Sequence, residues 1–142
     1  MRLTLVVLSL LILTGSCEEK VYTGDVNCDE CYTEKPQYAD LIIDLTINNR
    51  FGDVIVNIYE GEVEDNQVVL TDTVDFTPFY AYVKANKRYA VVAEYKKGTK
   101  TLYSVDGTKL KVLLVRGECD DDCYVIEGES MNATIKEEFL DF

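Results

Sequence analysis

Apolar and polar residues alternate along most of the chain that follows Tyr38. Alternation with a period of two is typical of strands that bury one face in a core and expose the other to water. It predicts a series of β-strands, and no stretch beyond Tyr38 has the sustained spacing of an amphipathic helix. The alternating segments are residues 41–47, 54–58, 79–83, 89–95, 110–114 and 131–135.

Turn-forming residues separate these segments, at 48–53, 60–61 and 96–98. Asp106-Gly107 is the sharpest hairpin signal, because a two-residue type I′ turn needs positive φ at both central positions. It predicts that residues 102–105 pair with residues 108–115. About seven or eight short strands over residues 38–142 predict one all-β domain, an antiparallel two-sheet sandwich.

The first 17 residues form a different pattern. Arg2 precedes a nearly unbroken apolar run over residues 3–13, and small residues then lead to Cys17. The run is too short to span a bilayer as a helix and predicts an export signal. With its cysteine, it resembles the lipobox of bacterial lipoproteins, which implies a signal peptide at residues 1–16 and acylation of Cys17, for example with palmitate. The alternative is a plain secretory signal cut near Ser16.

The residues after Cys17 bear on the expected localisation. Glu18-Glu19-Lys20 resembles the acidic surface-export signal of lipoproteins of the Bacteroidota. The resemblance implies a lipid-anchored protein of the outer membrane that faces the cell surface, with the periplasmic face as the alternative. A simple charged linker would have the same composition. Residues 17–37 are polar and are expected to form an acylated tether that carries Cys28 and Cys31.

Charge and composition narrow the function classes. The chain has 26 acidic and 14 basic residues, a net charge of −12, which disfavours nucleic acid and anionic lipid headgroups as partners. It has no histidine, the commonest general base and zinc ligand, and no tryptophan, the favoured platform for sugar rings. Together these absences disfavour hydrolases and typical lectins, and we expect a non-enzymatic protein without a cofactor.

Four further cysteines form two close pairs, Cys28/Cys31 and Cys119/Cys123. In an exported protein they predict disulfides, and three connectivities are possible. Two long-range links would fasten the N-terminal segment to the end of the sandwich, whereas two local links would form tight rings. A zinc site of four thiolates is the alternative, since paired cysteines at short spacing suit tetrahedral coordination. A free or redox-active role is a third possibility, which the neighbouring carboxylates oppose.

A family resemblance covers about a third of the chain. It rests on VIVNIYEG at residues 54–61, on DTV at 72–74, on TPFYAYV at 77–83 and on KRYAVVA at 87–93. These segments resemble the prealbumin-like or Ig-like sandwich repeats of secreted bacterial proteins, such as carboxypeptidase-regulatory-like and collagen-adhesin B-type modules. The resemblance implies a structural or binding module.

Three further groups of residues are candidate sites. Tyr80 and Tyr82 lie opposite Phe79, Ala81 and Val83 on one predicted strand, so they would face outward and could stack on a ligand, or could simply form a cross-strand aromatic pair. Asp72-Thr73-Val74 resembles the O-glycosylation acceptor of exported Bacteroidota proteins, with Thr73 as the acceptor. The weak calcium candidates are Asp120, Asp121 and Asp122.

Taken together, these features predict a non-enzymatic lipoprotein of the cell envelope that acts as a binding or accessory module. Its expected contacts are the membrane, through a lipid anchor, and an envelope protein or glycan. The alternative is a structural subunit or an adhesin or fimbria accessory, and a metal-binding protein is a weaker alternative.

Overall fold

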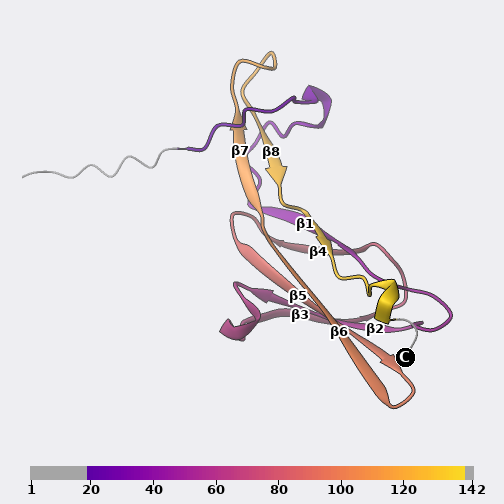
Figure 1. The fold of residues 1–142 in the computed structure, drawn as a ribbon. Coiled ribbons are helices and arrows are strands. Elements are labelled where there is room, and N and C mark those ends of the chain that lie inside the picture. Colours follow the sequence, from indigo (N-terminus) through magenta and orange to yellow (C-terminus); the bar gives the residue numbers. More distant parts are fainter. Residues whose placement is uncertain (1–18, 140–142) are drawn as a thin grey trace, which may run out of the picture.

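The computed structural model describes residues 19–139. Within them, nine strands and three short 3-10 helices follow one another, and there is no α-helix. The all-β sandwich predicted from the alternation is confirmed (Figure 1). The 3-10 helices are η1 (Cys28–Glu30), η2 (Val63–Asp65) and η3 (Glu137–Phe139).

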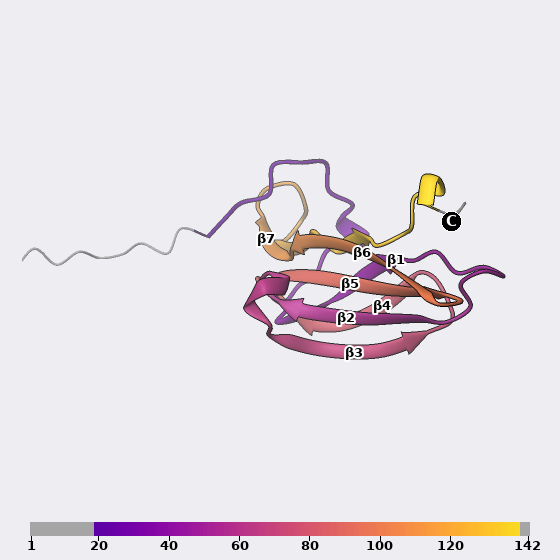
Figure 2. The ribbon, with the colours of Figure 1, turned by 60° about the horizontal axis from the view of Figure 1, so that its bottom comes forward.

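Two sheets form the sandwich. The three-stranded sheet has the order β4 (Phe79–Lys84), β1 (Tyr38–Asp44) and β9 (Ser130–Asn132), and β9 is parallel to β1. The four-stranded sheet has the order β3 (Val68–Val74), β2 (Val54–Glu60), β5 (Arg88–Lys97) and β6 (Lys100–Lys109), all antiparallel. Figure 2 shows β3, β2 and β5 side by side in one layer.

The core lies between these sheets and follows the predicted alternation. Leu41 and Ile43 of β1, Val54 and Val56 of β2 and Val91 of β5 are each completely buried. The polar or smaller residues between them face outward, because successive side chains of a strand point to opposite faces. Phe51, in the turn between β1 and β2, is also buried and closes one end of the core.

A third, two-stranded sheet extends beyond the sandwich in Figure 1, built from β7 (Lys111–Val115) and β8 (Cys123–Glu127). Four apolar residues of β7 are buried, yet they are not part of the main core cluster. The segment before β1 lies against this hairpin, through bridges between Val21 and Leu114 and between Tyr32 and Tyr124. The segment predicted to be a tether therefore covers β7 and β8 where the structure describes it.

One long side of the sandwich is closed by side chains. The carboxylate of Asp106, on the edge strand β6, accepts a hydrogen bond from the backbone N–H of Asn132, at 2.6 Å between Oδ2 and N. Two hydroxyls of the same strand donate to backbone carbonyls of the segment around β9, Ser104 to Thr134 and Thr108 to Gly128. Every second side chain in this part of β6 thus joins the two sheets.

The predicted hairpin at Asp106-Gly107 is wrong. Both residues lie inside β6, where Asp106 is paired with Val91 and Gly107 with Ala90 of β5. The hairpin turns instead at Gly98-Thr99, where the sequence also indicated a turn and where Gly98 has a φ of 62°. A turn at 106–107 would leave half of the ten-residue strand β5 without a partner, so pairing along its full length prevails over the local turn preference.

Two glycine substitutions test this correction. Gly107→Ala should change the free energy of unfolding by less than about 1 kcal/mol, because Gly107 is not among the residues with positive φ and a Cβ there would lie 3.4 Å from the nearest atom, Tyr89 O. Gly128→Ala should cost more than about 2 kcal/mol, because Gly128 has a φ of 81° and its Cβ would lie 2.3 Å from Lys109 O. Urea unfolding of both variants measures the difference. A large destabilisation by Gly107→Ala would contradict the pairing of Gly107 within β6 and would favour the type I′ turn predicted at this position.

Candidate functional site

A group of exposed aromatic side chains lies on the outer face of the three-stranded sheet. Tyr80 and Tyr82 of β4 are 55% and 72% exposed, while Phe79, Ala81 and Val83 between and beside them are buried. The two tyrosines therefore face outward, as the alternation predicted. We call Tyr38, Tyr80 and Tyr82 the tyrosine surface, since Tyr38 of β1 stacks on Tyr82 with ring centroids 5.4 Å apart. The stacking holds both rings in place, and the rings remain accessible.

A shallow groove of about 520 Å³ adjoins the tyrosine surface. It follows the side of the sandwich where the edge strands β3 and β4 face each other, and Leu70 and Asp72 of β3 line it opposite Tyr80 and Tyr82. This side differs from the one that β6 closes, because no hydrogen bond joins β3 to β4 among the described residues. The sandwich thus has one closed and one open side.

The open side leaves an unpaired strand edge. Ala85 N–H donates to Gln37 O at 2.9 Å, and in an antiparallel ladder such paired positions alternate. It follows that Phe79, Ala81 and Val83 bond to β1, and that the backbone N–H and C=O of Tyr80 and Tyr82 point away from it. No strand in the described part of the chain pairs with β4 on that side. These groups, beside two exposed rings, are available to a binding partner.

The facing edge, β3, is better protected. The carboxylate of Asp72 accepts a hydrogen bond from the N–H of Thr73 at 2.8 Å and so occupies a backbone donor of this edge. A β-bulge between Ile58 and Tyr59 of β2 also shifts the register of its pairing with β3. Charges and bulges are common means of discouraging the addition of a further strand. Of the two edges along the groove, β4 is therefore the more receptive.

Carboxylates give the tyrosine surface a negative surrounding. Asp40 of β1 lies opposite Tyr82 in the strand register and is exposed. The pKa of Glu129 is raised, first because the carboxyl group is partly buried and second because of the charge of Asp40.

On the core side of the groove, the hydroxyl of Tyr89 donates to Lys84 O at 2.8 Å, and burial raises the pKa of this tyrosine. Tyr89 therefore stays neutral and fixes the end of β4.

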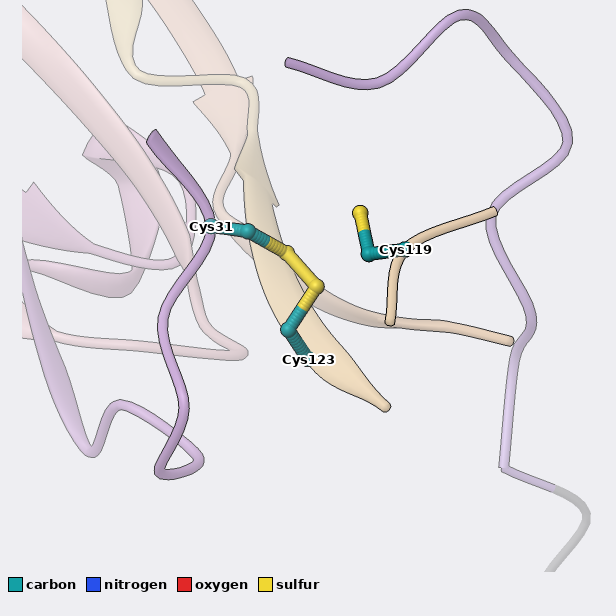
Figure 3. Close-up of side chains that lie close together, drawn as sticks. All are labelled: Cys31, Cys119 and Cys123. Carbon is teal, nitrogen blue, oxygen red and sulfur yellow. A yellow bond between two sulfur atoms is a disulfide. The ribbon is translucent and has the colours of Figure 1, made fainter. Parts of the chain in front are cut away.

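The four paired cysteines form two disulfides, Cys28–Cys119 and Cys31–Cys123. The disulfide prediction is confirmed, and of the three possible connectivities the structure has one of the two long-range ones. Figure 3 shows Cys119 beside the Cys31–Cys123 bond, and the sulfur atoms of these three residues lie within 4.8 Å of one another. All four thiols are consumed by the disulfides, so a four-thiolate metal site would require both bonds to be reduced.

The remaining predicted sites lie apart from the tyrosine surface. Asp120, Asp121 and Asp122 are exposed in the loop before β8, and Asp122 lies 3.7 Å from Arg116. They belong to no close group of three potential metal ligands within residues 19–139. Thr73 is exposed on β3, where its hydroxyl is accessible for modification. Cys17, the predicted lipidation site, lies outside the described residues.

Some features of this site could not be read from the sequence alone. The stacking of Tyr38 on Tyr82 depends on the pairing of β1 with β4, and alternation within one strand does not reveal which strand lies beside it. The groove depends likewise on β3, whose residues are mostly exposed on both faces and give only a weak alternating pattern. Exposed Val68 and Val69 are the signal that could have indicated a second surface near the tyrosines.

Comparison of this chain with protein-family models, with curated proteins and with solved structures found no match in any of the three. The resemblance to prealbumin-like modules and to Bacteroidota lipoproteins thus stays a prediction. Among the described residues, no helix has the length and apolar character that crossing a membrane requires.

Proposed function

We propose that this chain is a non-enzymatic lipoprotein of the bacterial cell envelope, anchored in the outer membrane through Cys17, and that it binds an envelope protein or glycan. Its tyrosine surface would make the contact outside the cell, with a periplasmic orientation as the alternative. The observation that carries the binding role is the pair of exposed tyrosines beside an unpaired strand edge. Aromatic rings fixed by stacking lose little conformational entropy when they bind.

Two other features support the proposed compartment. Two disulfides in a small domain suit an oxidising environment outside the cytosol. Val21 lies only four residues after the candidate anchor, and it forms a β-bridge with Leu114 of β7. A lipid on Cys17 would therefore hold the β7–β8 end of the molecule close to the membrane.

A direct test of the binding surface uses a photo-crosslinking amino acid in the native cell. Placed at position 80, it should capture an envelope partner, and Tyr82→Ala should reduce that capture at least about thirtyfold, as expected for an aromatic residue at the centre of an interface. The matched control is position 103, because Tyr103 is 62% exposed but lies on β6 of the other sheet. Equal capture at both positions, or none at position 80, would contradict the proposal.

The unpaired edge of β4 favours a second candidate function, a structural subunit or adhesin accessory that assembles through strand addition. Extended segments bind exposed sheet edges through main-chain hydrogen bonds, which give affinity without a deep pocket. In this case the captured partner would be a further copy of the chain or another subunit, recovered as a ladder of crosslinked species. A single discrete partner band would favour the binding module instead.

A further inference from the structure

A cluster of lysines stands out against the acidic average of the chain. Lys20, Lys35, Lys109 and Lys111 line one open pocket of about 530 Å³, and within residues 19–139 Glu19 is the one carboxylate in its lining. The chain as a whole has a net charge of −12, whereas this lining carries four positive charges and one negative. We call these four residues the lysine cluster.

The fold brings the lysine cluster together from three distant parts of the sequence. Lys20 is placed by backbone bonds to β7, since Leu114 N–H donates to Lys20 O at 3.2 Å and Tyr22 N–H donates to Leu114 O at 2.8 Å. Lys109 and Lys111 end β6 and begin β7. The Asn86 side chain, which also lines the pocket, accepts from Val112 N–H at 2.9 Å and fixes the start of β7.

The third part is the segment that the disulfides fasten. Lys35 follows Cys31, and its ammonium group lies 2.6 Å from Glu19 and 5.8 Å from the ring of Tyr124. A lysine is charged at neutral pH at its ordinary pKa of 10.5, and the hydrogen bond to Glu19 raises the pKa of Lys35 further. Lys111 lies 3.7 Å from Glu127, which leaves the cluster with an excess of positive charge after both ion pairs are counted.

The position of this cluster in the chain indicates its ligand. Lys20 is three residues from Cys17, so its Cα atom, at the pocket, lies within roughly 11 Å of that of the proposed lipid anchor. We infer that the lysine cluster binds the phosphate groups of anionic lipid headgroups in the membrane that holds the anchor, an inference that rests on the proposed lipidation. Acyl chains retain the protein at the bilayer, and basic residues beside them add electrostatic attraction to anionic lipid.

This inference refines the argument from net charge. Screening limits each charge to about 8 Å at physiological ionic strength, so a local excess of lysine acts on a nearby surface even when the whole molecule is acidic. The remaining, acidic part of the domain would be repelled by the same surface. The lysine cluster would be attracted to the bilayer, and the acidic surfaces elsewhere would be repelled by it. The molecule would therefore be held with its β7–β8 end toward the bilayer and its other surfaces away from it.

Lysine footprinting on the intact lipidated protein tests the inference. The protein is reconstituted in phosphatidylcholine vesicles with or without phosphatidylglycerol, and acetylation of each lysine by an activated ester is followed by mass spectrometry. The cluster should react at least about fivefold more slowly in the anionic vesicles. Each lysine near an anionic surface increases the binding constant for that surface by roughly a factor of five. Lys96 and Lys136, which lie outside the cluster, serve as internal controls and should not change.

The double variant Lys109→Gln/Lys111→Gln should remove most of the protection of Lys20 and Lys35, whereas Lys96→Gln/Lys100→Gln should leave it intact. Equal reactivity in both kinds of vesicle would overturn the inference. Equal protection by millimolar inorganic phosphate in phosphatidylcholine vesicles would overturn the assignment to lipid and indicate a soluble phosphate ligand. Intact mass, measured on the same sample, separates these outcomes from a failure of the lipidation itself.

Discussion

Removal of both disulfides should lower the free energy of unfolding by about 7 kcal/mol, but removal of either one alone by only about 2–3 kcal/mol. The reason is that both bonds join the same two short segments of the chain, with sequence separations of 91 and 92 residues. One bond alone closes the long loop in the unfolded chain. The second then closes only the small ring formed by residues 28–31 and 119–123, and loop-closure entropy rises with the logarithm of loop length.

Urea unfolding measures this non-additivity in three variants. They are Cys28→Ser/Cys119→Ser, Cys31→Ser/Cys123→Ser and the variant that carries all four substitutions. Hydrogen exchange should show the first losses of protection in the segment before β1 and in β7 and β8. None of the buried residues of these elements belongs to the main core cluster, and from β8 only the partly buried Ile126 packs against it. Of the two single-bond variants, loss of Cys31–Cys123 should cost more, since Cys123 is buried and Cys28 is exposed. Costs that simply add would contradict the closure of only a small ring by the second bond.

Substitution of Tyr95 should produce the other large effect. Tyr95 of β5 is completely buried, and its hydroxyl donates to Ala133 O at 2.6 Å and accepts from Thr46 N–H at 3.1 Å. It thus links the four-stranded sheet to both chain segments that extend from β1 and β9. Its ring also packs edge-on against Phe51 with centroids 5.3 Å apart. Tyr95→Ala should therefore cost about 3–5 kcal/mol.

Tyr95→Phe separates the hydroxyl from the ring. It should cost about 1–3 kcal/mol, because it leaves Ala133 C=O and Thr46 N–H without this partner in the interior. Burial raises the pKa of Tyr95, so its contribution is complete below the ordinary tyrosine pKa of 10.0 and is lost as pH rises through the higher pKa of the folded state. Tyr103→Phe is the control, since Tyr103 is exposed. A neutral Tyr95→Phe would show that the hydroxyl does not join the sheets.

The fold could be predicted largely because burial follows alternation. Leu41 and Ile43, or Phe79 and Ala81, are buried in the structure as the pattern requires. The Asp106-Gly107 error has the opposite origin, because turn preference is local and the pairing of β6 with β5 is not. Alternation also says nothing about which strands lie side by side. The parallel pairing of β1 with β9, across 88 residues from Ile42 to Ser130, therefore had no signal in the sequence.

The candidate site was predictable only in part, for the same reason. The outward direction of Tyr80 and Tyr82 follows from one strand alone, so the sequence was sufficient. The cysteine spacing predicted disulfides but not their connectivity, which depends on where the segment before β1 lies. The lysine cluster unites positions 20, 35, 109 and 111, which no motif connects. Features that depend on one strand could be predicted from the sequence. Features that depend on contacts between distant segments could not.

Intact mass spectrometry of the protein extracted from the membranes of its native cell tests the account most directly. We expect a chain that begins at Cys17, carries acyl groups on that residue and lacks the four hydrogen atoms that two disulfides remove. This result would place an oxidised sandwich on a lipid anchor, with its tyrosine surface free to bind. A water-soluble chain that retains its first 16 residues, carries no lipid and has free thiols would contradict the account.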